Sequence, residues 1–208
     1  MTELAADAMH AWWEYMPARI EYDQDADRLQ DTFKLWRDLQ FGDLVSLVMT
    51  DERLFRSPPR DVGWGLAHEV GPEHEPPGHS MLGRDQFEWL VEHADQAQDQ
   101  STWTVWCDEV LTVPFRVGAG AAAAYPVQGG WDGYTREREN LSQALDALDV
   151  SNLVTLTGDM HCYVAGYKQT EYRDAIQTLL RGRVPESERL GVEFMTPALT
   201  SLNAAEAL

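Results

Sequence analysis

The sequence is short of lysine, of cysteine and of long apolar runs, and each shortage excludes a class of protein. Lys34 and Lys168 are the only lysines, and 35 acidic residues against 16 basic ones give a formal net charge of −19. A surface of that sign repels nucleic acid and anionic membranes, so neither is expected as a partner. Two cysteines form neither a disulfide framework nor a four-cysteine zinc site. No stretch reaches the roughly 18 apolar residues of a membrane-spanning helix.

The acidic residues are spread along the whole chain rather than gathered in a tail. This distribution is typical of proteins from salt-loving organisms, because concentrated salt screens the self-repulsion. An acidic protein from an ordinary environment is the alternative. The first residues, MTELAADAMHAWWEYMP, lack a basic segment followed by an apolar one, so no signal peptide is expected on this chain. We expect a high-salt cytoplasm, unless the chain is part of an exported parent protein.

Apolar runs alternate with helical periodicity, which predicts one domain of α/β or mixed α+β class over residues 1–208. The expected helices are 28–40, 84–94 and 135–149, and the expected strands are 44–49, 102–107, 110–115, 153–157 and 191–196. Residues 57–79 and 116–130 are rich in Pro, Gly, Ala or charged residues and are predicted to be long loops. The histidines within the first of these loops, His68, His74 and His79, are interpreted as solvated.

An acid and an imidazole follow the apolar run LVTLT, where Gly158 ends the run before Asp159 and His161. Residues i and i+2 of an extended segment point to one side, and ligands of open α/β sheets gather beyond the carboxyl ends of strands. A carboxylate and a neutral imidazole suit hard and borderline metals, or can act as a base and its orienting residue. The structural alternative is a turn-capping Asp and a backbone-bonded His. Asp51 has a similar place after the strand 44–49.

Six segments, in the same order along the chain, resemble motifs of the alkaline phosphatase D-like (PhoD-like) metallophosphoesterases. They are AWWEYMPAR at 11–19, FGDL at 41–44 with DERLFR at 51–56, MLGRDQFEWL at 81–90, WDGYTRER at 131–138, TGDMH at 157–161 and EFMTPALTS at 193–201. The resemblance implies a phosphoric ester hydrolase of the alkaline phosphatase or phosphodiesterase type. It also implies a dinuclear metal centre in a four-layer α/β/β/α sandwich.

The resemblance also assigns roles to residues. His161 is implied as a metal ligand, Asp159 as a ligand or as the partner that orients one, and Asp132 as a third catalytic residue. The residues implied for substrate binding are Arg53, Trp131 and Tyr134. Iron, calcium, zinc and manganese are the candidate ions. Two such ions activate a water molecule and stabilise the charge of an in-line phosphoryl transition state.

The metal-binding motifs of the family that lie upstream, among them an Asp-Asp-His-Glu run, are absent from this sequence. We therefore expect the chain to carry one half of the metal centre, with the N-terminal half on another chain or with a homo-oligomer completing it. Half of a two-sheet sandwich would also leave apolar sheet surface uncovered. The alternative is an inactive remnant that serves as a binding or assembly module.

Overall fold

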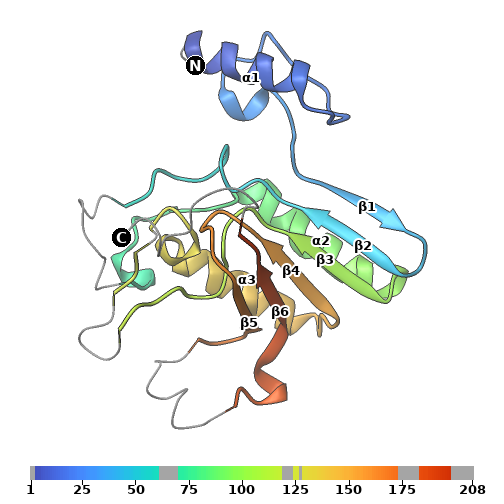
Figure 1. Ribbon diagram of the computed structural model, residues 1–208, viewed down its shortest axis with the longest axis vertical. Coiled ribbons are helices and arrows are strands. Elements are labelled where there is room, and N and C mark those ends of the chain that lie inside the picture. Colours follow the sequence, from blue (N-terminus) through green and yellow to red (C-terminus); the bar gives the residue numbers. More distant parts are fainter. Residues whose placement is uncertain (1–2, 61–69, 119–123, 127, 173–182, 198–208) are drawn as a thin grey trace.

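The chain forms one mixed six-stranded sheet with two long helices against one face (Figure 1). The computed structural model describes residues 3–60, 70–118, 124–126, 128–172 and 183–197. The strands are β1 (Arg37–Phe41), β2 (Val45–Met49), β3 (Trp103–Cys107), β4 (Leu153–Thr157), β5 (Val164–Gln169) and β6 (Arg189–Met195). The helices are α1 (Glu3–Tyr15), α2 (Arg84–Gln100) and α3 (Thr135–Ala147), with single turns η1 (Leu29–Asp31), η2 (Pro72–His74), η4 (Trp131–Gly133) and η5 (Glu186–Glu188).

The strand order is β1-β2-β3-β4-β6-β5. The four central strands β2, β3, β4 and β6 run parallel, whereas the edge strands β1 and β5 are antiparallel to their neighbours. The parallel arrangement brings the carboxyl ends of four strands to one edge of the sheet, where α/β proteins bind their ligands. The expected α/β class is therefore confirmed.

The face of the sheet against α2 and α3 carries the main core. Val48, Trp106 and Leu153 of three neighbouring strands are at most 3% exposed. They pack against an apolar stripe on each helix, represented by Leu90 of α2 and Leu145 of α3. Burial of each such side chain stabilises the fold by roughly 1.5–3 kcal/mol, and the stripes at helical spacing are the signal that predicted both helices.

The opposite face of the sheet is apolar and exposed. Strand register places Leu47, Val105, Val154 and Val192 side by side across the four parallel strands on this face. Large apolar side chains on the same face are 41% to 57% exposed, namely Leu39, Phe41, Trp103, Leu156, Tyr167 and Phe194. A contiguous apolar surface of this kind marks an interaction site. The described residues thus supply one sheet and one helical layer.

Two predicted elements are wrong. Residues 28–40 form no helix but the turn η1 and the edge strand β1, because pairing of β1 with β2 through a turn at Gly42 (φ +60°) overrides the helical spacing. Residues 110–115 form no strand, because the backbone N–H groups of Thr112 and Val113 donate to the carboxylate of Glu193 instead of to a neighbouring strand. Strand β5 was not predicted at all.

The described parts of the two predicted loops contain the single turn η2 and an isolated bridge between Val117 and Ala124. His79 is not solvated, since it is 8% exposed and stacks on Tyr134 with ring centroids 4.3 Å apart. Burial lowers the pKa of His79. His68 lies outside the described residues. Among the described residues, no helix has both the length and the apolar character needed to cross a membrane.

A serine substitution should have different effects on the two faces of β4. Leu153→Ser, on the helix-covered face, should destabilise the protein by about 3 kcal/mol, because it leaves a cavity and a buried hydroxyl. Leu156→Ser, on the exposed face, should cost less than about 1 kcal/mol and should reduce self-association and the binding of a hydrophobic dye. Urea denaturation, sedimentation and dye fluorescence at one salt concentration measure these effects. A monomeric native protein that binds no dye would contradict the assignment of an open apolar face.

Candidate functional site

Acidic side chains follow three of the parallel strands at the carboxyl edge of the sheet. Asp51 and Glu52 follow β2, Asp108 and Glu109 follow β3, and Asp159 follows β4. Backbone hydrogen bonds hold these strand ends together, since Thr50 N donates to Cys107 O (3.2 Å) and Asp108 N donates to Leu156 O (3.1 Å). This edge is the candidate site.

Arg53 joins two of these acids at the surface. Its Nη2 donates to Asp159 Oδ1 at 2.7 Å, and its Nε lies 3.6 Å from Glu109 Oε2. All three side chains are between 37% and 42% exposed, so the ion pairs add at most about 1 kcal/mol of stability. A guanidinium has the planar set of donors that suits a carboxylate or a phosphate, and the contact of Arg53 with a substrate stays a prediction.

Asp159 and His161 both lie on left-handed backbone, with φ angles of +74° and +53°. Such angles are uncommon for residues other than glycine and cluster at functional sites. The segment is a tight turn in which Met160 N donates to Gly158 O at 3.0 Å. The premise that these residues continue an extended strand is therefore wrong, although the prediction that they stand at the strand end is confirmed.

Asp51 fixes the backbone that carries Arg53. Its Oδ1 accepts hydrogen bonds from Arg53 N (2.8 Å) and Leu54 N (2.9 Å), which closes an Asx turn. The side-chain amide of Gln86, on α2, makes two hydrogen bonds to the backbone of Asp51. Asp51 N donates to Gln86 Oε1 (2.7 Å), and Gln86 Nε2 donates to Asp51 O (2.9 Å). Asp51 is fully buried, and burial raises the pKa of its carboxyl. The part played by Gln86 was not predicted.

Asp132 lies next to this edge but has both carboxylate oxygens engaged. Arg138 Nη1 donates to Oδ1 (2.8 Å) and Phe115 N donates to Oδ2 (2.9 Å). The side chain is 5% exposed, and burial raises its pKa although Arg138 opposes the shift. Asp132 and Asp159 border a common cavity of about 10 Å³. Through these contacts Asp132 fixes the position of the segment after β3. Its catalytic role stays a prediction.

The two aromatic residues expected at the substrate lie beneath the surface. Trp131 and Tyr134 are both 0% exposed. Trp131 Nε1 donates to Asp108 Oδ2 at 2.9 Å, and Tyr134 Oη donates to the backbone oxygen of Ser57 at 2.5 Å. Both side chains are therefore buried and bonded within the protein, and their contact with a substrate stays a prediction.

A buried polar network around Glu193 supports the whole edge. The Glu193 carboxylate is fully buried and accepts hydrogen bonds from Thr112 N (2.8 Å), Thr112 Oγ1 (2.6 Å) and Val113 N (2.8 Å). Lys168 of β5 donates from Nζ to Thr112 Oγ1 (2.5 Å) and lies 4.2 Å from the ring centroid of Trp106. Burial lowers the pKa of Lys168, which Glu193 and Asp108 oppose. A charged residue inside an apolar strand was the available sequence signal for Glu193.

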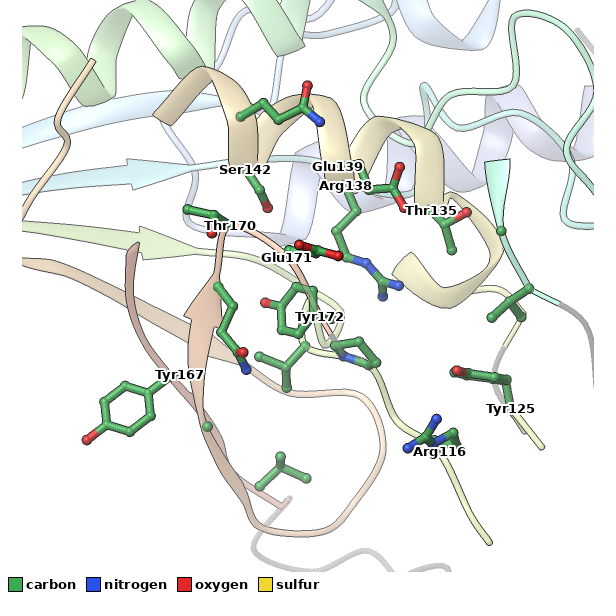
Figure 2. Close-up of a pocket in the computed structure, with 18 of the residues that line it drawn as sticks. Arg116, Tyr125, Thr135, Arg138, Glu139, Ser142, Tyr167, Thr170, Glu171 and Tyr172 are labelled. Carbon is green, nitrogen blue, oxygen red and sulfur yellow. The ribbon is translucent and has the colours of Figure 1, made fainter. Parts of the chain in front are cut away.

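The largest pocket lies elsewhere, between α3 and β5 (Figure 2). It measures about 1230 Å³, and its labelled lining includes Arg116, Tyr125, Tyr167 and Tyr172. Its buried cation, Arg138, is already paired with Asp132. Neither Asp159 nor His161 lines this pocket. The acidic residues that follow β2, β3 and β4 thus lie outside this pocket.

The residues at the strand ends do not complete a metal site. Within the part of the chain that the structure describes, no group of three or more His, Cys, Asp or Glu side chains is arranged to hold an ion. One oxygen of Asp159 is bonded to Arg53. A carboxylate and an imidazole are the kinds of donor that hard and borderline metals take, and the role of Asp159 and His161 as ligands stays a prediction.

Comparison with known proteins identifies the family. The family model described as PhoD-like phosphatase matches residues 1–208, and the chain belongs to this family. Alkaline phosphatase D of Bacillus subtilis (strain 168) is 25% identical over 205 residues, which cover 94% of this chain and 30% of that protein. A solved structure titled "Structure of PhoD" superposes with a TM-score of 0.76 at 25% identity, covering 95% of this chain and 34% of the other. The chain thus spans about a third of the length of these relatives.

The network around Glu193 predicts a large cost for its removal. Glu193→Ala leaves two backbone N–H groups and a hydroxyl without their acceptor and removes one of the carboxyl groups that face Lys168, so it should destabilise the protein by about 3 kcal/mol or more. Glu186→Ala, whose side chain is 93% exposed, should change stability by less than about 0.5 kcal/mol. Urea denaturation at constant salt measures both. Equal effects of the two substitutions would contradict the supporting role of Glu193.

Proposed function

We propose that this chain is part of a metal-dependent phosphoric ester hydrolase of the alkaline phosphatase or phosphodiesterase type. The observation that carries the proposal is the partly exposed Arg53–Asp159 pair, on a turn of left-handed backbone at the carboxyl edge of the sheet. Membership of the PhoD-like phosphatases supports the same reaction class.

Each residue at the edge has a role that its chemistry suits. Arg53 binds the non-bridging oxygens of the phosphate, because its planar guanidinium can donate two parallel hydrogen bonds. His161 and Asp159 would hold a metal ion, with iron, calcium, zinc and manganese as candidates. A bound ion supplies Lewis-acid stabilisation of phosphoryl charge and an activated water molecule. Asp132 acts here through Phe115 and Arg138, by holding the neighbouring segment in place.

The exposed sheet face suggests where the missing donors come from. A second sheet packs on such a face at a spacing of about 10 Å, and it would bring its own strand ends beside Asp159. We propose that the N-terminal half of the domain, on another chain or elsewhere in a longer protein, supplies this sheet. A second copy of this chain fits less well, because two surfaces of net charge −19 repel each other unless salt screens them.

A second candidate function rests on a separate observation. No group of three ligating side chains exists among the described residues, which favours an inactive remnant that binds or assembles with another protein. The remnant would use the same exposed face but would never hydrolyse an ester.

Turnover by the completed domain separates the two candidates. The chain is mixed with a polypeptide that carries the upstream portion of a PhoD-like domain, and hydrolysis of chromogenic phosphate diesters and monoesters is followed in high salt. Arg53→Lys should lower kcat/KM by about 10- to 100-fold, because a lysine cannot make the bidentate contact. Arg84→Lys, an exposed arginine of α2, is the control and should leave turnover unchanged. A stable complex without any hydrolysis would favour the remnant.

A further inference from the structure

Two buried carboxyl groups lie directly beneath the candidate site. Glu52 precedes Arg53, and Asp108 precedes Glu109. We propose that Glu52 and Asp108 share one proton across the ends of β2 and β3, and that this pair positions Arg53 against Glu109 and Asp159. The inference concerns the regulation of the site described above, and its functional meaning rests on the proposed function.

Both carboxyl groups are buried at the neighbouring ends of β2 and β3. Glu52 is 0% exposed and Asp108 is 4% exposed. Glu52 Oε2 accepts a hydrogen bond from the backbone N–H of Glu109, the residue after Asp108, so the Glu52 carboxyl group lies against this part of the chain. Glu52 Oε1 is buried and has no hydrogen-bond partner. Two ionised carboxylates can only accept, and a proton between Glu52 and Asp108 would give this oxygen a partner.

The remaining contacts tie the pair to the segments that carry the site. Glu52 Oε2 accepts a hydrogen bond from Glu109 N at 2.8 Å. Asp108 accepts from Val110 N through Oδ1 (3.1 Å) and from Trp131 Nε1 through Oδ2 (2.9 Å). Three carboxyl oxygens thus accept hydrogen bonds from fixed donors, and the side chain of Thr50 also faces the Glu52 carboxyl group. Glu52 Oε1 is the oxygen available for the proton.

The charges that surround the pair favour holding the proton. Glu109 faces Glu52 from the segment after β3, and Glu193 of β6 faces Asp108. Lys168 of β5 is the cation that faces both carboxyl groups. Arg138 of α3 acts on Lys168 but is itself paired with Asp132. One ammonium therefore faces three buried carboxyl groups, and a proton reduces the excess negative charge.

The pKa shifts agree with this arrangement. Burial raises the pKa of Glu52 from 4.5 to about 7 and raises the pKa of Asp108 well above its ordinary range. The folded state then keeps a proton that the unfolded state releases, so stability falls as pH rises from about 4.5 to about 7 and levels off above it. When the proton leaves, two buried carboxylates repel and separate the strand ends that carry Arg53 and Glu109.

The pH dependence of unfolding tests the pair without any substrate. Glu52→Gln mimics the protonated group, since its amide donates to Asp108 and its carbonyl still accepts from Glu109 N. From about pH 5 to about pH 8 at constant high salt, the unfolding constant of the natural protein should rise about 10- to 100-fold more than that of Glu52→Gln. Glu88→Gln, an exposed acid of α2, should behave as the natural protein does.

The partner substitution shows whether one proton is shared. Asp108→Asn should remove the same pH dependence, and the double variant Glu52→Gln/Asp108→Asn should remove no more than either single variant, because one titration is lost in each case. Additive losses would overturn the shared proton. A profile of Glu52→Gln that follows the natural protein would overturn the pair altogether.

Infrared spectroscopy keeps the proposal testable if a variant fails to fold. At about pH 6 exposed carboxyl groups are ionised, so the native chain should show a protonated carboxyl band that weakens in whichever single variant folds. Lack of any such band in the natural protein would overturn the pair. Since none of these readouts needs turnover, a failure to hydrolyse phosphate esters leaves this inference standing, and its own failure leaves the proposed hydrolase intact.

Discussion

The buried carboxylate of Glu193 is the interaction on which the rest of the structure depends. It accepts three hydrogen bonds from Thr112 and Val113, and Asp132 accepts a fourth from Phe115. These bonds hold residues 108–115, which follow β3, in one irregular conformation at the edge of the sheet. In this conformation Asp108 and Glu109 face Glu52 and Arg53. A conformation in which the buried carboxylate lost these partners would be less stable by several kcal/mol. The network therefore specifies one conformation of residues 108–115.

The sequence predicted the parts of the fold that depend on apolar pattern. The buried runs gave β2, β3, β4 and β6, and the stripes gave α2 and α3, because burial of one face is a local property of the pattern. It failed where a distant residue decides the outcome: residues 110–115 read as a strand, but their acceptor Glu193 lies about 80 residues away. In the site, the positions of Asp159 and Asp51 after strands were predictable from the apolar runs, whereas the contacts of Gln86 and Lys168 depend on packing between distant elements.

The two faces of the sheet differ in what covers them. One face is packed by α2 and α3 and carries the polar network that fixes the strand ends. The other face exposes Trp103, Leu156 and Phe194. The second sheet that we propose would cover this apolar surface and would supply metal donors at its own strand ends.

Metal content is the measurement that tests this account most directly. Elemental analysis is made on the chain alone, on the chain with the upstream portion of a PhoD-like domain, and on the same mixture with His161→Ala. The account predicts little metal on the chain alone, metal bound in stoichiometric amount by the mixture, and its loss in the variant. A complex that binds the same metal with and without His161, or none at all, would contradict the account.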